Sequence, residues 1–240
     1  MSCLLYCIFR TDAAPRLERP SEIAGQQVVV VAQNGLSVAL SELAVSEATP
    51  GVAEILAFAK VVEAFHRSRT VIPFRYGCCV ADSAGARDLL EAHHREYDAL
   101  LGELEGADEM GIRVLLPRAE SGGGNEPKPG YSNSSGASFD SGAAYLAARR
   151  QRCLELDRTV LEQRDFVDGL CSSLSGLYVR HKVEWQDSAR NRFLSLYFLV
   201  PRALQEMFRE AAGQFSSQRA AKLLLSGPWP PYNFVDSCEK

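Results

Sequence analysis

Two pairs of residues have side chains that bind transition metals or act as nucleophiles. Cys78 and Cys79 are adjacent in the sequence, and so are His93 and His94. Adjacent residues on a helix point about 100° apart, so the two histidines cannot easily face one ion. A cysteine nucleophile needs a histidine and an orienting group, and no local motif supplies them. We therefore expect surface histidines and small apolar thiols here, not a metal site or a catalytic centre.

Two other groups of residues, an acidic cluster and a run of glycines, have the types found in catalytic or phosphate-binding sites but lack the required pattern. Glu103, Glu105, Asp108 and Glu109 form an acidic cluster, but acidic residues between elements are usually solvated, so we expect them to be exposed at a domain junction. The glycines of 122–124 lack the Gly-Lys-Ser/Thr ending of a phosphate-binding loop. The sequence therefore predicts no catalytic residues, no metal and no cofactor, and a protein that is not an enzyme.

Arg75 is the most unusual charged residue, because it lies between Phe74 and Tyr76 in a predicted strand over 71–76. A buried arginine there would need a carboxylate or carbonyl partner, whereas one that points outward would need none. The sequence leaves both alternatives open. Gly77 follows directly and predicts a close backbone approach.

The C-terminal stretch LSGPWPPYNFVD combines three prolines with three aromatic residues. Proline fixes φ and has no N–H to donate, so the stretch can be neither a helix nor a central strand. Large aromatic side chains favour burial, which favours a strap that closes over the fold. The alternative is an exposed aromatic surface that a partner binds. The candidate residues are Pro228, Trp229, Pro230, Pro231, Tyr232 and Phe234.

Composition excludes several classes of protein. The 240 residues are 46% hydrophobic and 23% charged, which is typical of a globular protein. The net charge of -4 argues against a nucleic-acid-binding protein, which usually carries a basic face. The seven cysteines contain no Cys-x-x-Cys pair and predict reduced thiols in a cytosolic protein. No run of about 18 apolar residues occurs, so we expect no membrane span.

The first part of the chain predicts an α+β domain over residues 1–107. Short apolar segments predict strands, and the Asn34-Gly35 pair predicts a hairpin turn between two of them. Apolar residues repeat at intervals of three and four in two longer segments, which predicts helices. The expected strands are 4–9, 28–31, 36–40 and 71–76, and the expected helices run from about 50 to 65 and from 83 to 104.

The second part predicts a ferredoxin-like domain over 108–226, followed by a Pro/aromatic-rich tail over 227–240 that packs on the fold. A Gly/Ser-rich insert at 118–138 separates the first strand from a long helix. The order strand, helix, strand, strand, helix, strand is that of a split βαβ fold. The expected strands are 112–116, 177–185, 193–200 and 220–225. One expected helix ends at about residue 174, and the other begins at Pro201.

Four stretches of the sequence resemble the gas vesicle protein F/L family. They are LLYCIF, VIPFRYGC, MGIRVLL with AAYLAARR, and FLSLYFLVP with LLSGPWPPYNFVD. The last is the most specific, because chains of this family typically close on a similar Gly-Pro-Trp-Pro-Pro-Tyr-x-Phe segment. The chain departs from the family in the insert between Ser121 and Gly142 and at Cys78 and Cys79.

This resemblance implies a non-enzymatic, minor structural and assembly component of the gas vesicle, an intracellular organelle of the cytoplasm. Such a protein would bind the hydrophobic major shell protein and limit its aggregation during vesicle nucleation. Its partners would be the shell protein and other minor gas vesicle proteins, with neither nucleic acid nor lipid membrane. The resemblance also implies two α+β domains, the second ferredoxin-like. A different hypothesis is a small-ligand-binding or regulatory module, since ferredoxin-like domains often serve that purpose.

Overall fold

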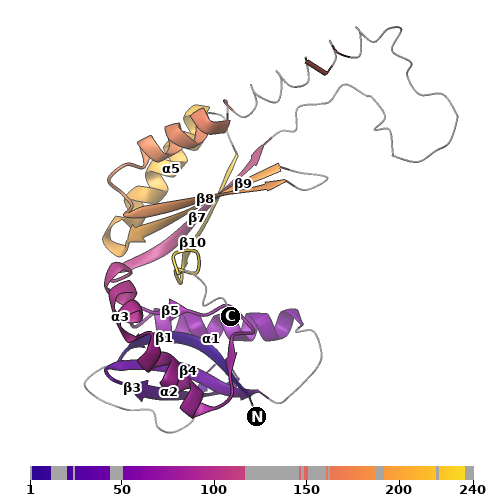
Figure 1. Cartoon of the computed structure of the whole chain (residues 1–240). Helices are drawn as coiled ribbons and strands as arrows, with labels where there is room; N and C mark the ends of the chain where they lie inside the picture. The colour runs from indigo at the N-terminus through magenta and orange to yellow at the C-terminus, as the bar shows by residue number, and fades with distance from the viewer. Residues whose placement is uncertain are drawn as a thin grey trace, which may run out of the picture.

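The structure, a computed structural model, describes residues 2–11, 21–23, 25–43, 51–116, 146, 149–150, 161, 163–187, 192–219 and 222–235. The chain is a mixed α+β protein whose strands form two antiparallel sheets. The sheets lie at the two ends of a crescent (Figure 1). We name the part around the six-stranded sheet the N-terminal lobe and the part around the four-stranded sheet the C-terminal lobe.

The N-terminal sheet is organised around its first strand, β1 (Ser2–Arg10). The strand order is β2-β3-β4-β1-β5, and β6 also pairs with β1. Residues 3–9 are all buried, because both faces of β1 are covered. This explains why the strand is an unbroken apolar run instead of an alternating one. The remaining strands are β2 (Ser21–Ile23), β3 (Gln26–Gln33), β4 (Leu36–Leu43), β5 (Ile72–Pro73) and β6 (Cys79–Val80).

One face of this sheet is covered by α1 (Val52–His66). Aromatic rings make the contact: Tyr6 stacks on Phe58 with centroids 5.0 Å apart, and Phe9 stacks on Phe65 at 5.2 Å. Such pairs add about 0.5–1.5 kcal/mol each beyond the area they bury. The helix is therefore fixed to the sheet by its second half.

The opposite face is covered by α2 (Ser83–Ala92) and α3 (His94–Glu103), through residues such as Leu90 and Leu101. The sequence predicts one helix here, and that prediction is wrong in detail. The chain bends at His93, whose φ of -111° and ψ of 18° are not helical. Each half packs on the sheet through its own apolar residues, Leu90 in α2 and Leu101 in α3.

The predicted hairpin at Asn34 and Gly35 is confirmed. Gln33 at the end of β3 pairs with Leu36 at the start of β4. Asn34 has a φ of 51° and Gly35 a φ of 85°, and a two-residue turn of this kind needs positive φ at both positions.

The C-terminal sheet has the strand order β10-β7-β9-β8, and each neighbouring pair is antiparallel. Its helices connect strands that are not neighbours. One helix includes residues 163–173, and the other, α5, follows a short 3-10 turn, η1. The elements are β7 (Ala107–Leu116), β8 (Arg180–Asp187), β9 (Arg192–Pro201), η1 (Arg202–Leu204), α5 (Gln205–Arg219) and β10 (Leu223–Trp229).

Both helices of this lobe pack on the same face of its sheet. Ile112 and Val114 of β7 point to that face and form a core with Leu170, Phe208 and Phe215. Side chains alternate along a strand, so the residues between them lie on the second face, which these helices leave uncovered. That uncovered face lies on the inner side of the crescent in Figure 1.

Two strand boundaries differ from the prediction. The strand expected over 71–76 is limited to Ile72–Pro73. The strand expected over 220–225 instead runs to Trp229 and contains Pro228. β10 tolerates a proline because it is an edge strand, and its register shifts between Ser226 and Trp229. The expected Gly/Ser-rich insert at 118–138 lies outside the described residues.

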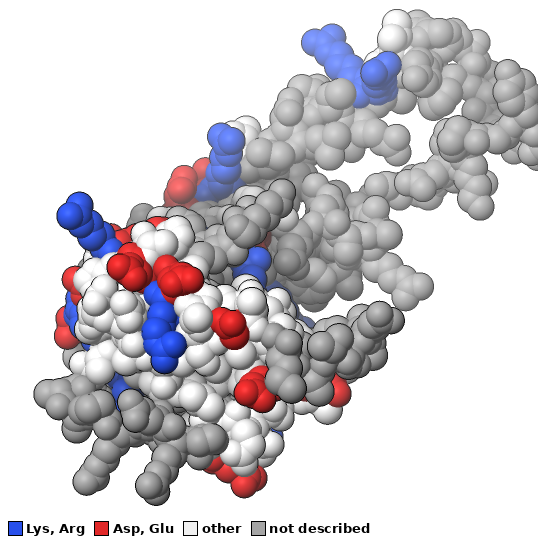
Figure 2. All heavy atoms as spheres, turned by 60° about the horizontal axis from the view of Figure 1, so that its bottom comes forward, with Lys and Arg blue, Asp and Glu red and all other residues white. Residues whose placement is uncertain are grey.

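The described surface of the N-terminal lobe is poor in charge, and the described helices are short. Within the described ranges, no helix is long and apolar enough to cross a membrane. Figure 2 shows the end of the N-terminal lobe, where carboxylates are scattered over a largely uncharged surface. Basic side chains do not gather among the residues described on that face.

Substitutions at two glycines should change the stability of the protein in opposite directions, because the two backbone conformations differ. Gly35 has positive φ with open space around it, so Gly35→Ala should cost about 1 kcal/mol through strain alone. Gly213 lies in α5, also in open space, so Gly213→Ala should stabilise the protein by about 0.5–1 kcal/mol. Urea unfolding of both variants measures these changes. If both substitutions changed the free energy of unfolding equally and in the same direction, the strained turn at Gly35 or the open helical position of Gly213 would be wrongly assigned.

Candidate partner-binding site

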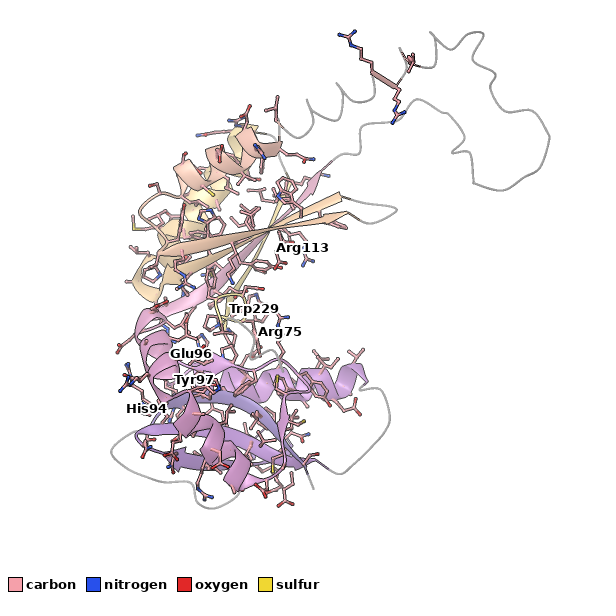
Figure 3. The ribbon with its side chains drawn as sticks, viewed as in Figure 1. Arg75, His94, Glu96, Tyr97, Arg113 and Trp229 are labelled. Carbon is pink, nitrogen blue, oxygen red and sulfur yellow. The ribbon has the colours of Figure 1, made fainter. Side chains whose placement is uncertain are left out.

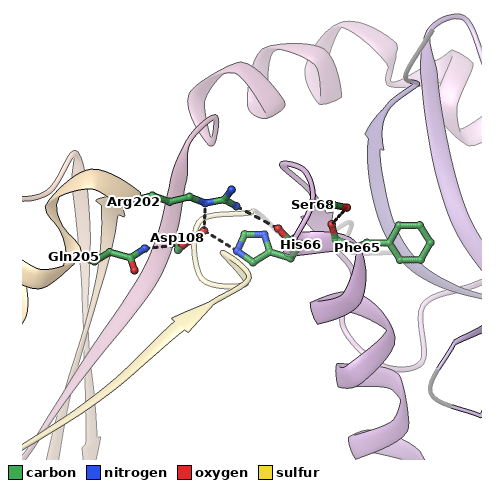
Figure 4. Close-up of polar contacts among 6 residues, drawn as sticks. All are labelled: Phe65, His66, Ser68, Asp108, Arg202 and Gln205. Carbon is green, nitrogen blue, oxygen red and sulfur yellow. Dashed lines mark hydrogen bonds and ion pairs between the residues drawn. The ribbon is translucent and has the colours of Figure 1, made fainter. Parts of the chain in front are cut away.

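A buried carboxylate, Asp108, lies where the two lobes meet (Figure 4). His66, the last residue of α1, places Nε2 2.8 Å from Asp108 Oδ1. Arg202 Nε donates to the same oxygen at 3.0 Å, and Gln205 Nε2 donates to Oδ2 at 2.6 Å. Arg202 also donates to the backbone carbonyl of His66 at 3.3 Å. The carboxylate therefore binds groups from both lobes.

The charge of Asp108 is stabilised by these contacts. Burial by itself would raise the pKa of the carboxyl group. The contacts with His66, Arg202 and Gln205 outweigh that effect and hold the pKa of Asp108 below its usual value. The group is therefore ionised at neutral pH, and its ionised form stabilises the junction.

A second buried carboxylate, Glu109, anchors the end of the chain. Its Oε2 accepts from the backbone N–H of Asn233 at 2.8 Å, and its Oε1 accepts from Asn233 Nδ2 at 2.6 Å. Burial raises the pKa of Glu109, and the two hydrogen bonds offset part of that rise. The prediction that Asp108 and Glu109 are solvated is wrong, because they are only 6% and 4% exposed.

Residues 230–235, which we name the C-terminal strap, run from the C-terminal sheet to the N-terminal core. Phe234 is 2% exposed and belongs to the core formed by β1, α2 and α3. Arg180 lies over its ring at 5.7 Å and also makes an ion pair with Glu103 at 2.7 Å. Tyr232 packs on the other N-terminal core, beside β1 and α1. The strap thus packs between the two lobes and contacts both of them.

The candidate residues of the tail divide into two groups. Pro230 and Pro231 are buried with Phe234, and Tyr232 is half-buried. Pro228 is exposed, and 44% of Trp229 is exposed on the last residue of β10. The segment therefore combines a packed strap with an exposed indole directly before it.

Arg75 and Gly77 lie in a turn, not in a strand. The N–H of Cys78 donates to the carbonyl of Arg75 at 3.3 Å, and Gly77 has a φ of 96°. The Arg75 side chain is exposed and forms no ion pair with any residue that the structure describes. Of the two alternatives for Arg75, the outward orientation is the observed one.

Figure 3 shows Arg75, Trp229 and Arg113 on the side where the lobes face one another. Arg113 was not among the residues singled out from the sequence. Its signal was present, since it is the one charged residue in the stretch MGIRVLL. His94 lies away from that side, on α3, where its Nε2 is 2.8 Å from the carbonyl oxygen of Asn34.

The described thiols have no features of a catalytic or metal-binding site. Cys3, Cys7, Cys79 and Cys171 are free, and burial raises the pKa of each. A raised pKa lowers the population of thiolate, which is the nucleophile and the metal ligand. The described residues contain no cluster of His, Cys, Asp and Glu that could hold a metal ion.

Comparison with known proteins identifies the family. The family model described as gas vesicle synthesis protein GvpL/GvpF matches residues 2–236. The chain belongs to the GvpL/GvpF family. A relative from this family, gas vesicle protein L of Streptomyces sp. (strain CB03234), is 28% identical over 191 residues, which cover 75% of this chain and 68% of the relative.

Solved structures of GvpF share the fold. GvpF from Anabaena sp. PCC7120 matches with a TM-score of 0.76 at 17% identity, covering 100% of this chain and 98% of that one. GvpF from Microcystis aeruginosa matches with a TM-score of 0.72 at 15% identity, covering 97% and 98%. At these identities the likeness concerns the mixed α+β architecture alone.

Membership of the GvpL/GvpF family gives the protein a role in gas vesicle assembly and associates it with that organelle. It also implies interaction with other gas vesicle proteins. The family is one of structural and assembly proteins and is not a known enzyme family.

The junction predicts a specific pH dependence. Because the pKa of Asp108 is lowered on folding, its stabilisation is complete above its unfolded value of about 3.9 and is lost as pH falls below it. Asp108→Asn should cost about 1–3 kcal/mol at pH 7. Urea unfolding should show this difference unchanged down to about pH 5 and shrinking at lower pH. A difference that is constant to pH 3 would contradict the account.

The strap predicts unequal effects of truncating two aromatics. Phe234→Ala removes a buried ring from the N-terminal core and should lower the free energy of unfolding by about 3–5 kcal/mol. Trp229→Ala, at a half-exposed position, should cost about 1 kcal/mol. Denaturant unfolding compares the two. If Trp229→Ala were the more damaging, the division of the tail into strap and exposed indole would be wrong.

Proposed function

We propose that this protein binds the hydrophobic major shell protein of the gas vesicle and limits its aggregation during vesicle nucleation. The observation that carries the proposal is the GvpL/GvpF family match over residues 2–236. A shell protein that faces gas must present an apolar surface. Each square ångström of such surface costs about 25 cal/mol in water, so a partner that covers it prevents self-association. Other minor gas vesicle proteins are proposed as further partners.

The contact surface we propose includes Arg75, Gly77, Pro228 and Trp229. Tryptophan and arginine are the residue types that most often dominate binding energy at protein interfaces. Trp229 exposes nearly half of its surface although it is large and apolar. Gly77 allows the turn that presents Arg75. Pro230, Pro231, Tyr232 and Phe234 would hold this surface in place, which reduces the entropy lost on binding.

We also propose that the C-terminal lobe is a ferredoxin-like domain. Its support is the antiparallel order β10-β7-β9-β8, in which each helix connects two strands separated by a third. The proposed boundaries are 1–107 and 108–226, with 227–240 as the tail. This division is supported by the two hydrophobic cores, because most buried apolar residues of each lobe form a core of their own and Leu199 of β9 is an exception.

The function can be tested by sedimentation of refolding shell protein. The purified shell protein is diluted from denaturant with and without this protein, and the soluble fraction is measured. The wild type should keep the shell protein in the supernatant at a near-stoichiometric ratio. Trp229→Ala should reduce that fraction several-fold, because it removes a large apolar contact.

Trp185→Ala is the matched control. Trp185 is 50% exposed at β8, the opposite edge of the same sheet from β10. It should leave the soluble fraction unchanged. A wild type that gives no protection at all would overturn the proposed function, and equal losses in both variants would remove Trp229 from the proposed surface.

A further inference from the structure

The face of the C-terminal sheet that its helices leave uncovered has two halves, an inner half beside the N-terminal lobe and an outer half further from it. At one end, Glu109 binds the strap and Leu199 packs into the N-terminal core. At the other end lie Arg113 of β7 and its Cα partner Leu224 of β10. Arg113 is exposed and 64% of Leu224 is exposed, and no described element packs over this outer half.

Arg113 is a cation in the interior of a sheet, and no opposing charge of the described residues is in contact with it. It lies on β7, which has a strand on either side. Among the residues described, none makes an ion pair with it. Glu184 is in the same cross-strand row, through Ser195, but instead accepts a hydrogen bond from the hydroxyl of Tyr197 at 3.4 Å. An acidic group of a partner can therefore pair with Arg113 without displacing an internal ion pair.

The strap shows how this sheet face binds a chain segment. Its inner half offers a carboxylate, Glu109, to the N–H groups of Asn233, and the next residue, Phe234, is buried. Arg113 is four residues further along the same face of β7, about 14 Å away at 3.4 Å per residue. It offers N–H donors instead of a carboxylate. The complementary ligand on the outer half thus carries a carboxylate beside apolar groups.

We propose that the outer half of this face, centred on Arg113 and Leu224, binds an apolar segment of the shell protein through a carboxylate of that segment. This inference rests on the proposed function and names the site and chemistry of that interaction. The segment continues the surface that the strap already occupies and reaches Trp229 at the end of β10. The guanidinium forms two parallel hydrogen bonds with the carboxylate, and Leu224 covers apolar side chains.

A charge reversal tests the proposal. The quantity measured is the concentration of this protein that keeps half of the refolding shell protein in the supernatant. Arg113→Glu should raise that concentration about tenfold, because it places like charges in contact. Raising the salt concentration should weaken the wild type more than the variant. Arg113 is exposed, so the thermal midpoint of the variant should match that of the wild type within a few degrees.

Arg87→Glu is the matched control, because it makes the same change in net charge at an exposed position on α2. It should behave like the wild type. A shell-protein variant with arginine in place of the paired carboxylate should restore protection by Arg113→Glu. If both charge reversals behave alike while the wild type protects, the inference is wrong and the proposed function stands. If the wild type gives no protection, both are overturned.

Discussion

The arrangement of the two lobes depends on one buried carboxylate, that of Asp108. It lies at the start of β7, the strand through which the chain enters the second lobe, and binds His66 from the first lobe and Arg202 and Gln205 from the second. A buried charge is costly unless it is paired, so Asp108 stabilises only the geometry that brings all three partners to it. The neighbouring Glu109 is also buried, and it accepts two hydrogen bonds from Asn233 in the strap.

The strap adds apolar contacts between the lobes to the polar contacts of Asp108. Phe234 enters the N-terminal core while Asn233 is bound to the C-terminal sheet, so the segment contacts both lobes at once. This leaves Trp229 exposed next to a segment that cannot easily move. A rigid apolar surface beside exposed arginines, such as Arg113, is suited to binding an apolar partner that also carries carboxylates.

Much of this fold could be predicted from the sequence, because its signals are local. The Asn34-Gly35 turn depends on two residues that accept positive φ, and the apolar run of β1 depends on its own composition. The site could not be predicted in the same way. Asp108 and Glu109 resemble solvated acidic residues until the fold brings partners that are distant in the sequence to them, including Asn233 at a separation of 124 residues. Arg113 was missed because a single strand does not reveal which of its faces is left uncovered.

Hydrogen–deuterium exchange, with and without the shell protein, tests the central claim most directly. The account predicts that the Asn233 amide, which donates to the buried Glu109, exchanges slowly in the free protein and stays protected when the partner binds. Protection should be gained at the outer half of the C-terminal sheet, around Arg113 and Leu224, and at the proposed contact surface around Arg75 and Trp229. Fast exchange at Asn233 in the free protein, or its exposure on binding, would show that the strap is a mobile ligand and contradict the account.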